Sequence, residues 1–360
     1  MDINMEKTED KIQEKNWNLT LPTAYRPLLG LRETEVAIKE IKDFFENHLA
    51  AALNLVRVSA PLFVRAGTGL NDDLNGVEKP VSFPVASLDG ESVEVVQSLA
   101  KWKRYMLGEL GFPEGEGLYT DMNAIRPDET MDNLHSIYVD QWDWEKVIPQ
   151  SARTVETLKD VVGEIYDVIC RTEFHLASRT RGLRPVLPEH VTFLTAQELL
   201  DRYPGKTPLQ RESAAVREHG AIFIIGIGGR LSDGTLHDGR APDYDDWITL
   251  REDGGSGLNG DLIVWHPVLG RAFELSSMGI RVSPETLRRQ LEIRGVPHWA
   301  DRPYHQKLLA GELPFTIGGG IGQSRLCMFF LRTAHIGEVS VGVWPEGMVE
   351  ACQRHRIPLL

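Results

Sequence analysis

A glycine-rich segment constrains this chain more than any other part of it. Residues 316–326 read Thr-Ile-Gly-Gly-Gly-Ile-Gly-Gln-Ser-Arg-Leu, and an apolar run over residues 327–331 follows directly. The pattern predicts a strand that turns straight into a helix, with Arg325 in the first helical turn. Glycines at alternate positions let a flat ligand lie close to the backbone. An arginine at that junction can hold a phosphate or stack on a ring.

The spacing of this segment excludes two well-known phosphate-binding motifs. A Rossmann fingerprint would need a third glycine where Gln323 stands, and a P-loop would need a Gly-Lys-Ser or Gly-Lys-Thr sequence. Glycines alone would be as consistent with a packing turn as with a ligand site. Because Arg325 stands at the predicted junction of strand and helix, we favour a nucleotide site.

The composition is that of an ordinary globular protein. Of the 360 residues, 25% are charged and 42% are hydrophobic, which is enough apolar material for one large domain or two small ones. The net charge of −13 argues against dependence on a nucleic-acid backbone. No run approaches the roughly 18 apolar residues of a membrane span, and the acidic N-terminus is unlike a targeting peptide. Three isolated cysteines suit a reducing compartment, so we expect a cytoplasmic protein without membrane or nucleic-acid partners.

The order of predicted elements is typical of an α+β fold with a mostly antiparallel sheet flanked by helices. We expect residues 1–25 to be a polar, mobile tail and residues 26–360 to form a single domain, with a helical insertion at about 150–220. Further predicted elements are a helix over residues 33–54, an edge strand over 55–58 that ends before Pro61, a loop over 66–77, a hairpin over 81–96 and a last strand over 341–344.

Two antiparallel strands are predicted over residues 119–126 and 136–144, with a polar loop between them. On the second strand, alternation places Gln141 and Asp143 on the face opposite to that of Trp142 and Trp144. Polar side chains in the middle of a sheet face cost free energy unless they are paired. We therefore interpret this face as the floor of a polar ligand site.

Three groups of charged residues each allow two interpretations. The run from Lys101 to Arg104 holds three cations, most simply a solvated helix face, although one lysine could point into an anion site. The loop over residues 232–247 carries five aspartates, and it is by default a solvated acidic loop or, alternatively, a source of carboxylates for an amine or a metal. Asp261 and Glu274 stand on neighbouring predicted strands, where they could together bind Mg²⁺.

Several of these motifs together resemble the catalytic domain of class II aminoacyl-tRNA synthetases. They are the sequence Arg-Pro-Asp-Glu at 126–129, the strand that carries Asp140 and Gln141, and the glycine segment. Within that group the chain most resembles the family of ammonia-dependent asparagine synthetases (aspartate–ammonia ligases), over roughly residues 30–350. This closer resemblance is carried by Asp72 in its loop and by residues 98–104, 139–144, 241–247 and 318–326.

The resemblance implies that ATP and L-aspartate form β-aspartyl-AMP and pyrophosphate, and that ammonia then displaces AMP to give L-asparagine. It implies that Arg126 holds the α-phosphate and the incoming carboxylate, that Arg325 clamps ATP, and that Mg²⁺ lies at Asp261 and Glu274. It also implies a homodimer that associates through the helix and strand before Pro61. The remaining implied residues are Asp72 and Lys103 for catalysis, Gln141, Asp143, Asp245, Ser277 and Arg281 for aspartate, and His135, Gly320 and Gly322 for ATP.

Electrostatics suggests how the aspartate would be held, but it leaves some roles open. The amino group needs carboxylates, for which Asp72, Asp143 and Asp245 are candidates, and the α-carboxylate needs a cation, for which Arg281 or Lys103 serves. Any of the three aspartates could deprotonate ammonium. Lys103 is preferred to Lys101 because it occupies the matching position of the family.

Other functions are less consistent with the sequence. An aspartyl-type tRNA synthetase would need an anticodon-binding domain and a basic face, and it would usually have an acid where Gln323-Ser324 stands. A catalytically inactive relative should have lost its motif arginines, but Arg126 and Arg325 are both present. A glutamine-dependent synthetase often exposes an N-terminal cysteine, whereas the first cysteine here is Cys170.

Overall fold

A large β-sheet forms the centre of the computed structural model, which describes residues 9–72 and 79–360. The predictions for residues 1–8 and 73–77 lie outside the described residues. Eight strands pair in the order β3-β7-β8-β13-β12-β11-β10-β9. Among the described strands, β3 with β7 and β9 with β10 pair in parallel, and the other neighbours of this sheet are antiparallel. The predicted α+β class is thus confirmed. The strands are β3 (Leu55–Arg57), β7 (Gly117–Ile125), β8 (Tyr138–Val147), β9 (Thr192–Thr195), β10 (Ala221–Ile225), β11 (Asn259–His266), β12 (Arg271–Ile280) and β13 (Thr316–Gly322).

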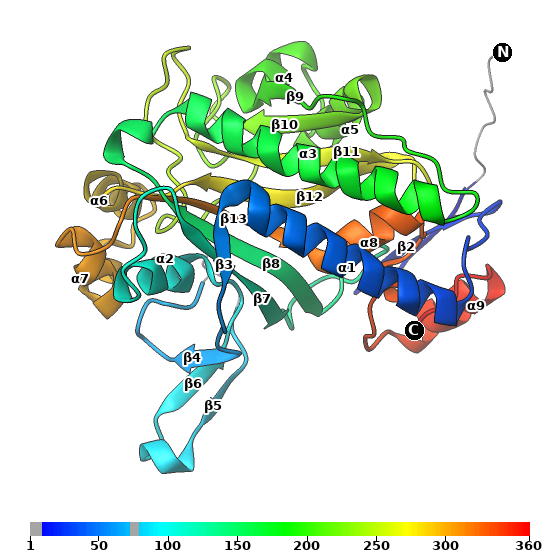
Figure 1. Ribbon diagram of the computed structural model, residues 1–360, viewed down its shortest axis with the longest axis horizontal. Helices are drawn as coiled ribbons and strands as arrows, with labels where there is room; N and C mark the ends of the chain where they lie inside the picture. The colour runs from blue at the N-terminus through cyan, green and yellow to red at the C-terminus, as the bar shows by residue number, and fades with distance from the viewer. Residues whose placement is uncertain (1–8, 73–78) are drawn as a thin grey trace.

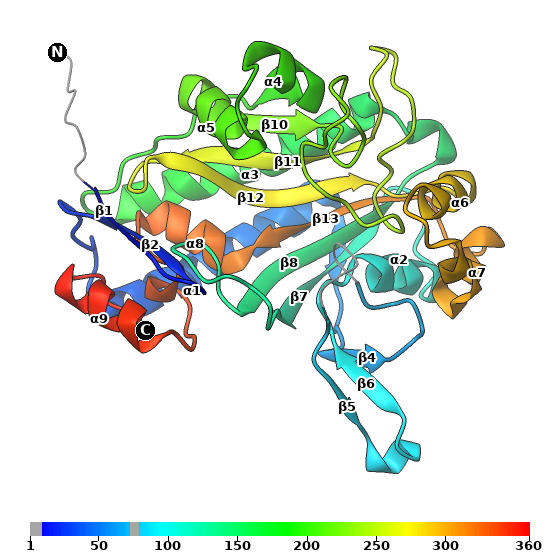
Figure 2. The same cartoon turned by 180° about the vertical axis from the view of Figure 1, so that it is seen from behind.

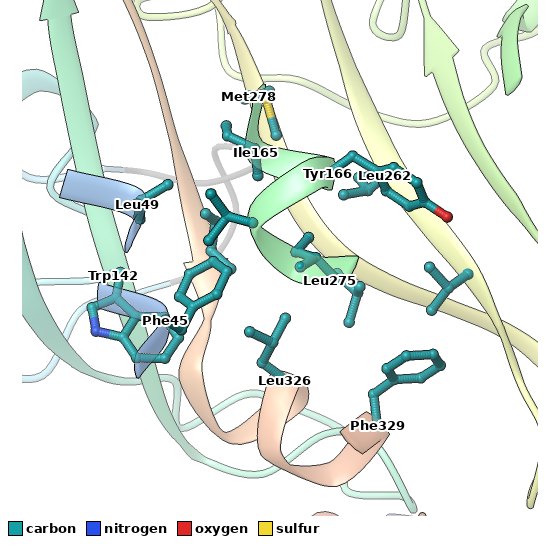
Figure 3. Packing of buried hydrophobic residues seen from close by; sticks show 14 of the residues in the cluster. Phe45, Leu49, Trp142, Ile165, Tyr166, Leu262, Leu275, Met278, Leu326 and Phe329 are labelled. Atoms are coloured by element: carbon teal, nitrogen blue, oxygen red, sulfur yellow. The ribbon is translucent and has the colours of Figure 1, made fainter. Parts of the chain in front are cut away.

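Helices α1 (Leu31–Leu53), α3 (Val155–Arg179) and α8 (Gln323–Leu331) cover one face of the sheet (Figure 1). On α1 the residues Ala37, Ile41, Phe45, Leu49 and Leu53 recur every four positions and are all buried, as an amphipathic helix requires. Figure 3 shows Phe45 and Leu49 close to Trp142 of β8. The predicted helix over 33–54 and the edge strand that follows it are therefore present.

The opposite face of the sheet carries α2 (Ala100–Glu109), α4 (Ala196–Arg202) and α5 (Pro208–His219) (Figure 2). Helices α4 and α5 pack on the outer strands β9 to β11, where Ile222, Ile224 and Ile263 form a second core. The region predicted as a helical insertion therefore supplies the core helix α3 and the edge strand β9 as well as α4 and α5. The central strands β8, β13 and β12 keep a polar surface on this face.

The prediction of a mobile polar tail is wrong from residue 9 onward. Strands β1 (Glu9–Gln13) and β2 (Asn18–Pro22) form an antiparallel pair beside the C-terminal helix α9 (Glu346–Arg354) (Figure 2). Leu19 and Leu21 alternate inward and are buried with Cys352 of α9, and the Tyr25 hydroxyl donates to Glu338 at 2.7 Å. Burial of these few apolar side chains orders a segment whose average composition is polar.

The predicted strand over residues 341–344 is also wrong. These residues lead into α9 without joining a sheet, and Val341 and Val343 are 70% and 75% exposed. Alternation of valine with small residues fits a strand, but a strand also needs a neighbour with which to pair.

A small three-stranded sheet, in the order β4-β6-β5, projects from the main body (Figures 1 and 2). Its strands are β4 (Phe63–Arg65), β5 (Ser82–Pro84) and β6 (Ser92–Val95). The predicted hairpin over 81–96 is confirmed, since β5 pairs with β6 and Asp89 and Gly90 both have positive φ at the turn. The remaining elements are α6 (Pro284–Ile293), α7 (Pro303–Leu309) and the short 3₁₀ turns Ala86–Leu88, Gln150–Ala152, Pro297–Asp301 and Ile336–Glu338. None of the helices within the described ranges is long and apolar enough to cross a membrane.

Candidate active site

A cleft of about 580 Å³ lies over β8, β12 and β13, on the sheet face opposite α1 and α3. Every predicted site residue except Asp261 contributes to its lining, so segments from residue 72 to residue 325 meet at one place. The lining includes Asp72, Lys103, Arg126, His135, Gln141, Asp143, Asp245, Glu274, Ser277, Arg281, Gly320, Gly322 and Arg325.

The deep end of the cleft is a buried network of charges. Arg281 donates to both carboxylate oxygens of Glu145, from Nε at 2.9 Å and from Nη2 at 2.8 Å, and its Nη1 donates to Asp245. Lys103 donates to the Gly319 carbonyl at 2.8 Å and lies 3.3 Å from the Asp143 carboxylate. Two cations thus neutralise most of the charge of three carboxylates, as buried ions require. One negative charge is left over, which suits a cationic amino group.

Charge and burial have opposite effects on the pKa values in this network. Burial alone would raise the pKa of Glu145, but Arg281 and Lys103 outweigh it, and the pKa is lowered. Burial lowers the pKa of Lys103 despite the nearby carboxylates of Asp143 and Glu145. Burial raises the pKa of Asp245, and Arg281 only partly offsets this rise. Asp245 is therefore a carboxylate that a further cation would stabilise.

The cation run in α2 is not a solvated helix face, contrary to the simplest prediction. Lys101, Lys103 and Arg104 are each only 1% exposed. Lys101 donates to Asp243 at 2.7 Å, and the Arg104 guanidinium donates to the carbonyls of two neighbouring segments at 2.7 and 2.9 Å. These buried cations therefore hold α2 against the segments that contain Asp243, Val282 and Pro314. Of the two lysines, Lys103 is the one that lines the cleft, as predicted.

The acidic loop over residues 232–247 divides into two parts. Its first aspartates, Asp233 and Asp238, are exposed, but Asp243, Asp245 and Asp246 are buried. Asp246 accepts a hydrogen bond from Arg153 at 2.6 Å. The solvated default is thus wrong for the second half of the loop. Asp245 lines the cleft, and its role as a carboxylate for an amine or a metal stays a prediction.

The glycines of β13 make room mainly for protein side chains. A Cβ on Gly318 would overlap the Glu145 carboxylate, and a Cβ on Gly320 would overlap the Gln141 carboxamide. The expectation that glycines open the strand to a flat ligand is therefore only part of the explanation. Gly320 and Gly322 still line the cleft, and Gly322 directly precedes α8, which carries Arg325.

The two motif arginines lie in the cleft with few partners. The Arg126 guanidinium donates to the Gln97 carbonyl at 3.4 Å, and its buried Nε has no acceptor among the residues that the structure describes. Arg325 donates to the Glu274 carbonyl at 3.1 Å and lies 3.5 Å from the Glu274 carboxylate. These weak contacts leave both guanidinium groups available to a phosphate.

His135 is held by the neighbouring Asp132. The ring Nδ1 of His135 lies 2.8 Å from the Asp132 carboxylate. Burial would raise the pKa of Asp132, but the hydrogen bond from His135 outweighs it and lowers the pKa to about 2. The ring is thereby oriented at the edge of the cleft, where its other nitrogen can contact a phosphate.

The predicted metal ligands are only partly available. A β-bulge after Leu262 places Asp261 opposite Ser277, while Glu274 lies opposite Ile263. Asp261 pairs with Arg240 and does not line the cleft, whereas the Glu274 side chain is 44% exposed and does. Partial burial, and next the Asp261 carboxylate, raise the pKa of Glu274. Two carboxylates close enough to repel each other fit a divalent cation, and Mg²⁺ often takes one or two carboxylates together with substrate phosphates.

Four residues that lie in or beside the cleft were given no role in the sequence-based assignment. Strand alternation places Glu145 on the Gln141 and Asp143 face of β8, but no role was assigned to it. Tyr244 and Arg240 carry no comparable signal, because they lie in an irregular loop. Gln97, just before α2, would also have gone unnoticed, since an isolated glutamine has no characteristic spacing.

Comparison with known proteins agrees with this geometry. A family model described as aspartate-ammonia ligase matches residues 32–356. The aspartate–ammonia ligase of Clostridium perfringens (strain SM101) is 57% identical over 342 residues, which cover 95% of this chain and 99% of that protein. The aspartate–ammonia ligase of Ruminiclostridium cellulolyticum is 56% identical over 343 residues, with the same coverage of both chains.

Among the solved structures with the same fold are tRNA synthetases. The asparaginyl-tRNA synthetase of Entamoeba histolytica, in complex with asparaginyl-adenylate, has a TM-score of 0.62 at 14% identity, over 86% of this chain and 66% of that one. A putative aspartyl-tRNA synthetase from Leishmania major gives a TM-score of 0.62 at 13% identity, over 86% and 64%. The architecture is therefore that of class II synthetase catalytic domains. The chain itself belongs to the aspartate–ammonia ligase family, and its reaction is the ATP-dependent synthesis of asparagine from aspartate and ammonia.

Proposed function

We propose that this reaction takes place in two steps within the cleft over β8, β12 and β13. In the first step the β-carboxylate of aspartate attacks the α-phosphate of ATP, and pyrophosphate leaves. In the second step the nitrogen of ammonia forms a C–N bond to the β-carboxyl carbon, the C–O bond to AMP breaks, AMP leaves with the electron pair, and the nitrogen loses a proton. The observation that carries the proposal is that two lightly paired arginines share one cleft with a buried network of charged side chains.

Arg126 and Arg325 would bind the nucleotide. Negative charge builds up on the phosphoryl oxygens during the attack, and positioned cations that need no reorganisation stabilise that charge best. Arg126 would contact the α-phosphate together with the β-carboxylate. Arg325 would clamp ATP above Gly320 and Gly322, with His135 at its phosphates.

The buried network would orient the aspartate. Arg281 or Lys103 would attract the α-carboxylate, and the excess of carboxylates, namely Asp143 and Asp245 with Asp72 nearby, would hold the amino group. Gln141 and Ser277 add neutral hydrogen-bonding groups to the same cleft. This arrangement leaves the β-carboxylate beside Arg126, where a near-attack geometry accelerates the reaction.

Glu274, with Asp261, would hold Mg²⁺ beside the phosphates. When bound, the ion would supply positive charge to the phosphate oxygens of ATP. In the structure Arg240 supplies positive charge to Asp261, so we expect Glu274 to be the stronger ligand of the two.

A homodimer is the assembly that we propose. Helix α1 and the edge strand β3 expose apolar side chains that one solvated helix face does not need, among them Leu31, Val36 and Val56. A two-fold interface over this surface would cover them. A cytoplasmic location likewise stays a prediction.

An isotope experiment tests the proposed chemistry at a single atom. Aspartate labelled with ¹⁸O only in its β-carboxylate should transfer one label to AMP when ATP, Mg²⁺ and ammonium are supplied without tRNA. The α-carboxylate, held by Arg281 or Lys103, should transfer none. Label that reaches AMP from the α-carboxylate, or turnover that requires tRNA, would show that the amino acid binds in the reverse orientation.

A further inference from the structure

A second cavity, which we call the side cavity, opens beside the cleft. It has a volume of about 340 Å³, and it shares Arg126, Glu129, Asp238, Tyr244 and Ser277 with the cleft. Its walls come from the loop after β7, from Gln97 in the segment that leads into α2 and from the acidic loop near Asp238. In the proposed arrangement ATP and aspartate fill the cleft, and the side cavity adjoins it beside Arg126, where the β-carboxylate is activated.

Gln97 lies in the wall of the side cavity, and its side-chain oxygen accepts no hydrogen bond from the part of the protein that the structure describes. The residue is 1% exposed, and its Oε1 finds no hydrogen-bond donor among residues 9–72 and 79–360. The amide cannot simply rotate to satisfy this oxygen, because its Nε2 donates to the Asp72 carbonyl at 3.0 Å. A buried acceptor without a partner is costly, and a ligand that carries N–H groups would remove that cost.

Tyr244 faces both cavities from a strongly negative environment. Burial, followed by the carboxylates of Asp72 and Asp245, raises the pKa of this phenol well above its ordinary value. The hydroxyl therefore stays protonated at neutral pH, and no described residue accepts or donates a hydrogen bond at it. The part of this rise that comes from Asp72 and Asp245 favours a cation beside the phenol oxygen, whereas burial, its largest cause, does not.

The charges in the wall of the side cavity also favour a small cation. Three carboxylates, Asp128, Glu129 and Asp238, stand against the two arginines Arg126 and Arg240. Arg240 is already paired, since it bonds Asp261 and lies 3.3 Å from Asp238. Arg126 will meet the phosphate of the adenylate. Carboxylate and carbonyl acceptors without free donors recognise an ammonium ion, whose hydrogens are all donors.

We propose that the side cavity is the ammonium-binding site, with Gln97 Oε1 and Tyr244 Oη as its neutral acceptors. This inference rests on the proposed function, because it places the third substrate against the β-carboxyl carbon that Arg126 activates. Ammonium held there reaches that carbon without crossing the nucleotide. On passing from ammonium to amide the nitrogen loses two protons, one before and one after the C–N bond forms, and the carboxylates of the wall lie beside it to accept the first.

The two half-reactions separate this inference from the proposed function. Aspartate-dependent exchange of pyrophosphate into ATP needs no ammonium, whereas formation of asparagine does. Tyr244→Phe removes only the hydroxyl, and Gln97→Met removes the carboxamide at similar length. In each variant we expect the KM for ammonium to rise about 10-fold or more, the usual effect of losing one hydrogen bond to a charged ligand. The exchange reaction and its KM for aspartate should stay within about 2-fold of the wild-type values.

Asp233→Asn provides a matched control. Asp233 is an exposed carboxylate of the same loop that hydrogen-bonds Thr235 and lies outside both cavities, so this variant should keep the wild-type KM for ammonium. If Tyr244→Phe and Gln97→Met both keep it too, or if they raise the KM for aspartate instead, the inference is overturned. Wild-type protein that shows no pyrophosphate exchange would refute the proposed function itself. Circular dichroism identifies a variant that fails to fold, and the other variant then decides.

Discussion

Replacing Glu145 by glutamine tests the buried charge network directly. The substitution keeps the shape of the side chain and removes one charge. Glu145 is completely buried, and its two oxygens accept three bonds from Arg281, at 2.9, 3.1 and 2.8 Å, and one from the Thr316 hydroxyl at 2.6 Å. In glutamine one of these oxygens becomes an NH₂ group that faces donors.

The size of the effect follows from these contacts. Removing one partner of a buried ion pair typically costs about 3–5 kcal/mol. Part of this cost lowers the free energy of unfolding, because Asp245 is then the one carboxylate among the described residues that still pairs with Arg281. If about half of it, roughly 2 kcal/mol, appears in aspartate binding, the KM for aspartate rises about 30-fold. The KM for ATP should change less than about 3-fold, because Glu145 contacts no residue assigned to the nucleotide.

Pyrophosphate exchange, measured against aspartate and against ATP, separates the two constants. Glu173→Gln is the matched control: Glu173 is a buried carboxylate that accepts from Arg332 and from two backbone amides, on the other face of the sheet. It should lower the melting temperature while leaving the KM for aspartate unchanged. An unchanged KM for aspartate in Glu145→Gln, or an equal rise in both variants, would refute the argument that this network orients the substrate.

Three further predictions follow from the structure. Arg126→Ala and Arg325→Ala should each fold, and each should raise the activation free energy by about 3 kcal/mol or more, measured by pyrophosphate exchange; near-normal exchange in either would contradict its assignment. Light scattering at micromolar protein should show a dimer, and a monomer would contradict the interface over α1. Burial raises the pKa of Glu338 from 4.5 to about 7 and lowers that of His335 from 6.5 to about 4. Between about pH 4.5 and 6.5 native Glu338 keeps a proton that the unfolded chain releases, which lowers stability as pH rises, and His335 has the opposite effect. Each residue changes the free energy of unfolding by up to about 1.4 kcal/mol per pH unit, and in the wild-type protein the two changes cancel. In Glu338→Gln only the effect of His335 is left, so the free energy of unfolding, measured by urea titration, should rise with pH over this range. A flat profile would contradict this.

Long, periodic elements were predictable because each contains its own signal. The four-residue spacing of apolar side chains on α1 and the alternation on β8 are local patterns. They indicate a helix and a strand without any information about distant residues. The hairpin over 81–96 was predictable from Asp89-Gly90 for the same reason. The N-terminal pair β1 and β2 was not, since its two inward leucines matter only because α9, more than 320 residues later, covers them.

The same distinction applies to the site. Arg126 and Arg325 stand in long motifs, so their place in one cleft could be predicted. The burial of Lys101 could not be predicted, because its partner Asp243 is 142 positions away in the sequence. His305, which lies 2.9 Å from the same carboxylate, is further still. A run of cations gives no sign of which carboxylates the fold will bring to it. The three cations by themselves therefore favoured a solvated helix face, whereas pairing with distant residues buries them.

The glycines of β13 have a consequence for how this enzyme family tolerates change. Since the Glu145 carboxylate and the Gln141 carboxamide occupy the space above Gly318 and Gly320, a methyl group on either glycine would displace a side chain of the proposed aspartate-binding site. Each glycine is therefore coupled to a polar side chain of β8, Gly318 to Glu145 and Gly320 to Gln141. A smaller residue at position 145 would not by itself make room at position 318, because a Cβ there would still lie 2.7 Å from the Trp144 carbonyl oxygen.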